Sequence, residues 1–411
     1  MFFRRLVLNS FSKLTFGRLE VLLPDGARGV YGGLGTGLQA RIEVLDENFF
    51  KRCVLHGPIG FAEGYMAGEW TSDDLTKVIS WFILNADDAE ALQTRDSRGT
   101  GFFNLLNAAN RLLHMRRRNS RAMSRENIRE HYDLSNEFFQ LWLDGTMTYS
   151  SAYFENADES LEVAQARKYD KLCRRLRLTP ADSVLEIGSG WGGFSMHAAR
   201  NYGCRVTTTT ISQQQYDEAS RRIQAAGLAE RIQLLLCDYR DLRGRFDKIA
   251  SIEMLEAVGD RYVNGYFAKT TELLHPRGLL GLQAILCPDN QYPILRAGVD
   301  FIQKHIFPGS LLMSNARIAQ AMNACGELNL LEYEDMAPHY ALTLRRWREG
   351  FEAKLDEVRA LAFDEAFIRK WRYYLCYCEA AFGTRHITVA QMVYSRPDNL
   401  ALTAPFYQLP G

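Results

Sequence analysis

Three glycines at alternate positions are the first residues with an evident chemical use. The stretch VLEIGSGWGG, residues 184 to 193, places Gly188, Gly190 and Gly192 after a hydrophobic run, with Glu186 two residues before the first glycine. A glycine-rich turn between a strand and a helix lets a ligand approach the backbone closely. The order Glu-x-Gly-x-Gly-x-Gly differs from the dinucleotide pattern G-x-G-x-x-G. We therefore expect a ligand at this turn, with a purely structural turn as the alternative.

Polar residues also follow the next two predicted strands. Thr210 and Gln215 lie at the end of the second strand, and Asp238 and Tyr239 lie at the carboxyl edge of the third. Ligands of open α/β sheets bind at these carboxyl edges. The second strand ends without an acid and the glycines precede no Walker lysine, which disfavours a dinucleotide and phosphate cradling. An adenosine ligand without a pyrophosphate fits, and S-adenosylmethionine is the candidate. Glu186 would hold its methionine part and Asp238 would face its adenine.

Strand-like and helical segments alternate through the second half of the chain. This alternation is typical of a doubly wound, mostly parallel sheet in an α/β fold. The seven strand candidates are SVLEIG (183–188), CRVTTTTIS (204–212), IQLLLCD (232–238), FDKIASIEM (246–254), GLLGLQAIL (278–286), NLLEYEDM (329–336) and ITVAQMVYS (387–395).

The first part of the chain has a different pattern. Strand-like runs RLEVLL (18–23) and LQARIEVL (38–45) flank the glycine-rich turns of 24–35, and a helical pattern follows near 73–84. We therefore expect a small α+β domain over residues 1–100.

A basic amphipathic linker is expected over 101–126. It is either a helix packed on its own protein or a helix lying on a membrane surface, where Arg116, Arg117, Arg118, Arg121 and Arg125 would meet anionic headgroups. The larger domain would then span 127–411.

Composition excludes several classes of protein. The 411 residues carry a formal net charge of zero, so global charge indicates no polyanionic partner such as nucleic acid. The apolar runs are shorter than the roughly 20 residues that cross a bilayer. Eight cysteines without framework spacing are typical of reduced thiols in a cytoplasm. The histidines show no metal-ligand spacing, and we expect no metal.

The chain resembles a known family in ordered stretches that cover nearly all of 127–397. They are HYDLSNEFFQLWLDGTMTYSSAYF (131–154), VLEIGSGWGG, TISQQQ (210–215), EMLEAVG (253–259), FIQKHIFPGS (301–310), PHYALTL (338–344) and YYLCYCEAAFGTRHITVAQMVYSR (373–396). These stretches are similar to the cyclopropane-fatty-acyl-phospholipid synthases, S-adenosylmethionine-dependent methyltransferases that act on lipids. The resemblance implies a class I methyltransferase-like sheet with a smaller lipid-side domain at the N-terminus.

The resemblance also implies roles for single residues. Glu256 matches a carboxylate that helps to hold a bicarbonate ion, Ile285 and Tyr340 match other residues around that ion, and Cys378 matches a cysteine counted as catalytic. Expected contacts of S-adenosylmethionine are Tyr149, Ser150, Gly188, Gly190, Gly192, Thr210, Gln215, Asp238 and Tyr239.

Three positions depart from the family pattern. Ser151 replaces a bicarbonate-contacting cysteine, Gln283 replaces a histidine, and Ala257 replaces another histidine. Serine and glutamine keep a hydrogen-bonding atom where the family has one. Bicarbonate is therefore expected as the proton acceptor, held by Glu256, Ser151, Gln283, Ile285 and Tyr340. The thiol of Cys378 is expected to pack rather than react, because methyl transfer to carbon needs no thiolate.

The resulting hypothesis is an enzyme that transfers a methylene group to the cis double bond of an unsaturated acyl chain in a membrane phospholipid, forming a cyclopropane ring. Methyl transfer without ring closure and an inactive lipid-binding homologue are the alternatives. The resemblance further implies a homodimer at the inner face of the membrane.

Overall fold

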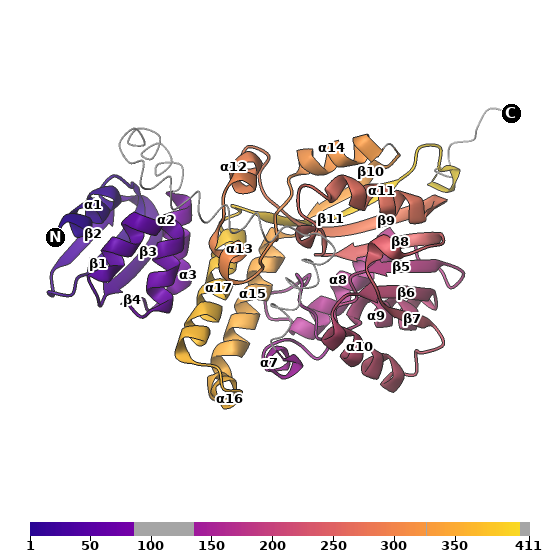
Figure 1. The fold of residues 1–411 in the computed structure, drawn as a ribbon, viewed down its shortest axis with the longest axis horizontal. Helices are drawn as coiled ribbons and strands as arrows, with labels where there is room; N and C mark the ends of the chain where they lie inside the picture. The colour runs from indigo at the N-terminus through magenta and orange to yellow at the C-terminus, as the bar shows by residue number, and fades with distance from the viewer. Residues whose placement is uncertain (86–134, 326, 403–411) are drawn as a thin grey trace. The chain divides into compact units, whose positions relative to one another are not determined.

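The computed structural model describes residues 1–85, 135–325 and 327–402 (Figure 1). The expected linker over 101–126, with its arginine cluster, lies outside these described residues. The described elements group into two compact units. The first unit contains described residues of Met1–Arg117 together with Ile294–Pro308 and Ala341–Ile387, and the second contains the rest. Two later segments of the chain thus belong to the N-terminal unit. The expected domain boundaries place both segments in the larger domain of 127–411.

The second unit is built on a seven-stranded sheet of order β10-β11-β9-β8-β5-β6-β7. β11 is antiparallel to both of its neighbours, and the β9-β8-β5-β6-β7 pairs are parallel. The predicted doubly wound, mostly parallel sheet is confirmed, and each of the seven predicted strands is present. Their bounds are β5 Ser183–Ile187, β6 Arg205–Thr210, β7 Ile232–Leu236, β8 Phe246–Ile252, β9 Leu274–Leu286, β10 Asn329–Asp335 and β11 Thr388–Ser395.

Helices connect these strands and begin at residues suited to capping. The hydroxyl of Ser160 accepts a hydrogen bond from the backbone N–H of Val163, and that of Ser212 accepts one from Gln215, so both helix starts gain a partner for a free N–H. The elements are α7 Asn136–Gln140, α8 Leu161–Arg175, α9 Gly193–Tyr202, α10 Gln213–Ala225, α11 Val263–Leu273, α14 Asn315–Cys325 and the 3₁₀ turns η1 Tyr239–Asp241, η2 Leu255–Ala257 and η3 Leu400–Leu402.

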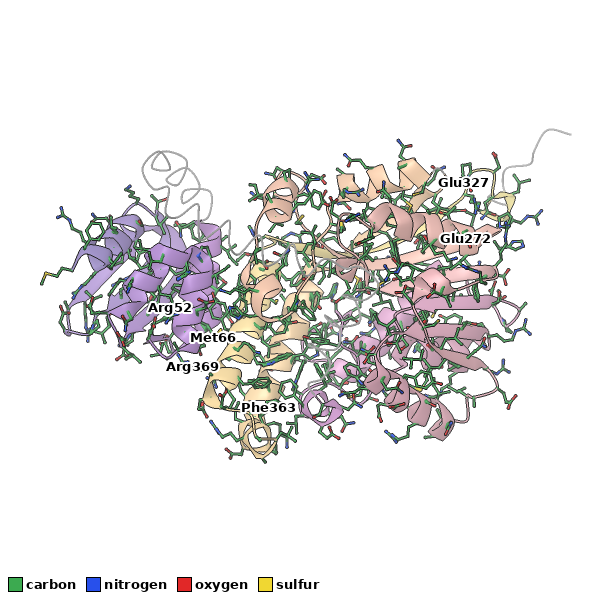
Figure 2. The ribbon with its side chains drawn as sticks, in the orientation of Figure 1. Arg52, Met66, Glu272, Glu327, Phe363 and Arg369 are labelled. Carbon is green, nitrogen blue, oxygen red and sulfur yellow. The ribbon has the colours of Figure 1, made fainter. Side chains whose placement is uncertain are left out.

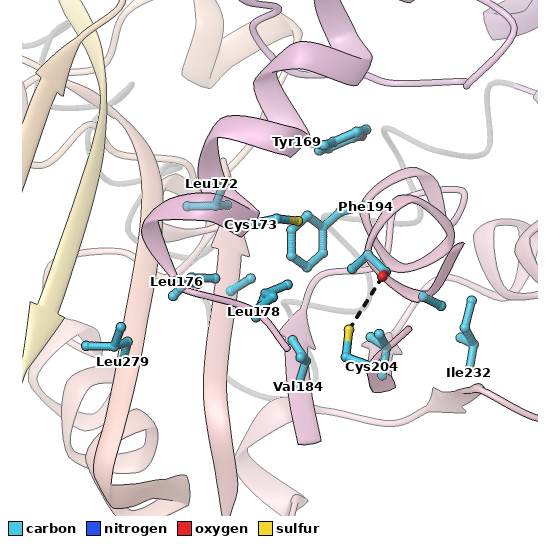
Figure 3. Close-up of a cluster of buried hydrophobic side chains, with 14 of the residues drawn as sticks. Tyr169, Leu172, Cys173, Leu176, Leu178, Val184, Phe194, Cys204, Ile232 and Leu279 are labelled. Carbon is cyan, nitrogen blue, oxygen red and sulfur yellow. Dashed lines mark hydrogen bonds between the residues drawn. The ribbon is translucent and has the colours of Figure 1, made fainter. Parts of the chain in front are cut away.

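Helices α8 and α9 cover the sheet through one apolar cluster (Figure 3). Leu172 of α8, Leu176 directly after this helix, Phe194 of α9 and Val184 of β5 are each at most 1% exposed. A Cβ on Gly281 of β9 would lie 2.8 Å from Leu172 Cδ1, so glycine is what permits this helix to approach the strand. This packing holds β5 in place, and the glycine turn follows the carboxyl end of β5.

The first unit contains a four-stranded sheet of order β2-β1-β3-β4. The segment predicted as glycine-rich turns contains a strand, β2. Its residues Arg28–Gly32 pair antiparallel with β1 although they include glycines. The elements are α1 Phe2–Phe11, β1 Phe16–Leu22, β2 Arg28–Gly32, β3 Leu34–Val44, α2 Asn48–Met66, β4 Trp70–Thr71, α3 Leu75–Leu84, α13 Phe301–His305, α16 Leu355–Ala360 and α17 Glu365–Gly383. Helices α12 Tyr292–Ala297 and α15 Ala337–Ala353 cross the boundary between the units.

Long-range ties hold the late segments in the first unit. Arg369 of α17 donates through Nη2 to the carbonyl oxygen of Trp70, at 2.8 Å. Within the N-terminal segment itself, Arg52 of α2 donates to the carboxylate of Glu69, with Nη2 2.6 Å from Oε1 (both arginines are labelled in Figure 2). Within the ranges that the structure describes, no helix is both long and apolar enough to span a membrane.

Candidate active site

The glycine turn leaves the end of β5 with its backbone open to a ligand. Gly188, Gly190 and Gly192 adopt positive φ angles of 94°, 48° and 87°, which L side chains rarely adopt. The N–H groups of Gly188 and Ser189 donate to the carbonyl oxygen of Thr209, at 3.1 and 2.9 Å, and so anchor the turn to β6. A Cβ on Gly190 would meet no protein atom within 4 Å. The turn therefore presents bare backbone at the carboxyl edge of the sheet.

Glu186 sits on β5 directly before this turn and is 2% exposed. Its Oε2 accepts a hydrogen bond from Thr208 Oγ1 of the paired strand at 2.6 Å and another from the hydroxyl of Ser195 on α9. Burial raises the pKa of the Glu186 carboxyl to about 7, against the opposing effect of these hydrogen bonds and of the charge on Lys168. The structure thus ties Glu186 to the base of the turn.

The ends of β6 and β7 bring the other predicted cofactor residues to the same edge. Thr210 Oγ1 donates to Gln215 Oε1 at 2.8 Å, which links β6 to the start of α10. Asp238 is 4% exposed and accepts from Arg240 Nε at 2.8 Å. The Tyr239 ring packs edge-on against Tyr266, and burial raises the pKa of its hydroxyl to about 12.

Tyr149 and Ser150 lie between α7 and α8. Tyr149 contacts aromatic rings, whereas Ser150 contacts a lysine. The ring of Tyr149 packs against Phe139 and Trp142, with centroids 5.4 and 5.6 Å apart. The hydroxyl of Ser150 accepts from Lys168 Nζ at 2.7 Å. Lys168 is fully buried, and burial lowers the pKa of its ammonium group to about 7.

Three of the residues predicted to hold bicarbonate converge on the carboxylate of Glu253. The backbone N–H of Ser151 donates to Oε1 at 2.8 Å, and Gln283 Nε2 donates to the same oxygen at 2.7 Å. The Tyr340 hydroxyl donates to Oε2 at 2.7 Å. Ser151 uses its backbone here, because its hydroxyl donates to the carbonyl oxygen of Ala152 at 3.0 Å.

The other two residues of the predicted bicarbonate set meet each other. The backbone N–H of Ile285 on β9 donates to Glu256 Oε1, while Glu256 Oε2 is buried and accepts no hydrogen bond within the described structure. Burial raises the pKa of Glu256 to about 8, and the charge of Glu253 raises it further in the same direction. At neutral pH, therefore, Glu256 holds its proton.

Cys378 belongs to the other unit, on α17, and is half-buried. Burial raises the pKa of its thiol well above the ordinary value, and the nearby Asp300 carboxylate acts in the same direction. A thiol in this environment stays protonated and is a poor nucleophile.

The residue-by-residue predictions missed Glu253, Lys168 and Gln391. Gln391 donates from Nε2 to Gln283 Oε1 at 3.0 Å, which turns the amide N of Gln283 toward Glu253. One signal was available for Glu253, because it directly follows a buried strand whose end lies at the ligand edge of the sheet. No such signal was available for Lys168, because a lysine in an amphipathic helix is usually an ordinary polar surface residue.

The fold and the glycine turn together define a class I S-adenosylmethionine-dependent methyltransferase. The residues fit this cofactor, because bare backbone at Gly190 follows β5 and a buried carboxylate at Asp238 follows β7, and these parallel strands on either side of β6 end at the same edge of the sheet. The model of the mycolic acid cyclopropane synthetase family matches residues 119–392. The chain belongs to this family.

Relatives match across most of the chain. The tuberculostearic acid methyltransferase UfaA1 of Mycobacterium tuberculosis is 38% identical over 364 residues, covering 84% of this chain and 81% of its own. The cyclopropane-fatty-acyl-phospholipid synthase of Escherichia coli is 35% identical over 362 residues, covering 87% and 88%. A solved structure of the mycolic acid cyclopropane synthase CmaA1, complexed with SAH and CTAB, is 29% identical with a TM-score of 0.62 and covers 66% of this chain and 98% of its own.

Proposed function

We propose that this enzyme transfers a methylene group from S-adenosylmethionine to the cis double bond of an unsaturated acyl chain in a membrane phospholipid, forming a cyclopropane ring. The relative from Escherichia coli, named for this activity, matches 87% of the chain, a share that includes parts of both units. The N-terminal unit is therefore expected to serve the same lipid substrate class.

The observation that carries the proposal is the pair of carboxyl groups beside the glycine turn. When bound, S-adenosylmethionine supplies an electrophilic methyl group. An alkene has no proton to lose before it attacks, so this chain must hold the double bond close and exclude water. A proton must leave only afterwards, which requires an acceptor at the site. Glu253 and Glu256 provide carboxyl groups there, and the expected bicarbonate ion is the competing proposal for the acceptor.

Methyl transfer without ring closure is the second candidate. The relative from Mycobacterium tuberculosis that is 38% identical is named as a methyltransferase of tuberculostearic acid rather than as a cyclopropane synthase. The sequence identity of this relative to the chain, 38%, is similar to the 35% of the Escherichia coli synthase. The two products therefore have to be separated by experiment.

Association with the membrane surface is part of the proposal. In helix α1 the side chains of Phe2 and Leu6 are 71% and 40% exposed, and Arg5 is exposed on the same helix. Apolar side chains next to basic ones are typical of helices that lie on anionic membranes. A peripheral, cytoplasmic enzyme and a homodimer remain proposals on the family resemblance.

The decisive assay uses methyl-labelled S-adenosylmethionine and vesicles of unsaturated phospholipid. We expect label in the phospholipid acyl chains, loss of olefinic protons, and cyclopropane ring protons in the NMR spectrum of the extracted lipid. A labelled branched chain without ring protons would favour the second candidate. Cofactor binding without any labelled lipid would contradict both.

A further inference from the structure

A single carboxylate occupies the centre of the donor set that was expected to bind an external anion. Glu253 accepts from the Ser151 N–H, the Gln283 amide and the Tyr340 hydroxyl, all at 2.7 to 2.8 Å. Ser151, Gln283 and Tyr340 are buried and come from three separate segments. Charge-assisted hydrogen bonds of this length favour an ionised acceptor.

The backbone at Glu253 supports a role beyond packing. Its φ angle is +49°, in the left-handed region that favours glycine. Its N–H donates to the carbonyl oxygen of Gln283 at 2.7 Å, so the turn is held in this conformation. Unfavourable backbone conformations of this kind cluster at functional sites. Glutamate at a position suited to glycine indicates that the side chain is kept for its chemistry.

The segment that carries Glu253 lies beside the glycine turn. A Cβ on Gly188 would lie 3.2 Å from Met254 Cγ, and Ser251 Oγ donates to the carbonyl oxygen of Ile187 at 3.3 Å. Residues on both sides of Glu253 thus contact the strand end and turn where the cofactor is expected. Of the two carboxyl groups at this edge, Glu253 is therefore the one that three donors surround beside the predicted cofactor site.

The surroundings of Glu253 act on its pKa in two opposite directions. Burial raises the pKa of Glu253, while the hydrogen bonds from Tyr340 and Ser151, the charge of Lys168 and the Gln283 amide act in the opposite direction. Glu256 adds a neutral carboxyl group at the same edge. A carboxylate whose pKa is raised above the ordinary value is a stronger proton acceptor than a free carboxylate.

We propose that the Glu253 carboxylate is the proton acceptor of the reaction and takes the place of an external bicarbonate ion. This proposal rests on the proposed ring-forming function. The π electrons of the alkene form the new bond to the transferred methyl carbon, the C–S bond breaks, and its electron pair stays on sulfur. Glu253 then removes one proton from the added methyl group, and that C–H electron pair closes the ring. The products are the cyclopropane, S-adenosylhomocysteine and one proton, which Glu253 releases to solvent.

The test compares ring formation in the parent and in three variants, in carbon dioxide-depleted buffer and with added bicarbonate. The parent is expected to keep its rate without bicarbonate. E253Q is expected to lose about 10²- to 10⁴-fold, the usual contribution of a general base. E253G should also be slow, and added bicarbonate should restore part of its rate. Glycine suits the φ of +49° and leaves the three donors in place for the ion.

D260N is the matched control. Asp260 follows η2 and accepts from the Tyr292 hydroxyl at 2.6 Å and from Arg317 Nε at 2.7 Å, so D260N also removes a carboxylate bonded to a tyrosine. We expect ring formation close to that of the parent. Affinity for S-adenosylmethionine, measured by calorimetry, confirms that each variant is folded.

Two results would overturn the proposal. One is a parent enzyme that loses ring formation without bicarbonate and regains it on addition. The other is E253Q, or E253G without bicarbonate, forming rings at a rate close to that of the parent. A parent that binds S-adenosylmethionine but labels no lipid would instead overturn the proposed function, and this proposal with it.

Discussion

Replacing Glu256 by glutamine is expected to change how the stability of the fold depends on pH. In the folded chain, burial and the charge of Glu253 raise the pKa of Glu256 from 4.5 to about 8. The unfolded chain releases this proton near pH 4.5, so between pH 4.5 and 8 the folded state binds more protons than the unfolded state. Stability therefore falls as pH rises through this window.

The size of the effect follows from the two pKa values. At about 1.4 kcal/mol for each pH unit, the difference between 4.5 and about 8 sets an upper limit of about 5 kcal/mol at pH 8. Glu256 is partly exposed as a whole, although its Oε2 is buried, so we expect about 2 kcal/mol. Glutamine cannot ionise and avoids this cost, but it leaves a buried amide that costs about 1–3 kcal/mol at every pH.

The assay is the melting temperature of E256Q and of the parent at several pH values from 4.5 to 8. The difference, E256Q minus parent, should rise with pH by about 4–8 °C, at 2–4 °C for each kcal/mol in a domain of this size. A difference that stays constant across this range would refute the reasoning. It would mean that Glu256 ionises in the folded state as readily as in the unfolded one.

Three further substitutions test the cofactor turn and the role of the Cys378 thiol, with Gly227→Ala as a control. Gly190→Ala and Gly227→Ala each place a Cβ in open space at a positive φ, so both should cost about 1–2 kcal/mol of stability. Only Gly190→Ala should weaken S-adenosylmethionine binding, by tenfold or more in calorimetry. If the two variants bind the cofactor with equal affinity, the cofactor does not bind at this turn. Cys378→Ser should keep lipid labelling within about threefold of the parent, because burial keeps this thiol protonated; a loss of a hundredfold or more would restore a chemical role for sulfur.

The sequence by itself was enough for the sheet and for the glycine turn at its edge. The run 183–187 became a central strand, because a strand buried on both faces is hydrophobic along most of its length. The glycines at 188, 190 and 192 predicted a turn with positive φ angles, since few other residues adopt them. Local chemistry decides such features, and local chemistry is visible in a single chain.

The carboxylate at the centre of the site was decided by tertiary structure alone. Glu253 meets Ser151 from 102 positions earlier and Tyr340 from 87 positions later, and the sequence contains no sign of either pairing. The same is true of Arg369, which ties α17 to Trp70 across 299 positions and places late residues in the N-terminal unit. Periodicity shows which face of a strand or helix is buried, but only packing decides which distant donors meet a given acid.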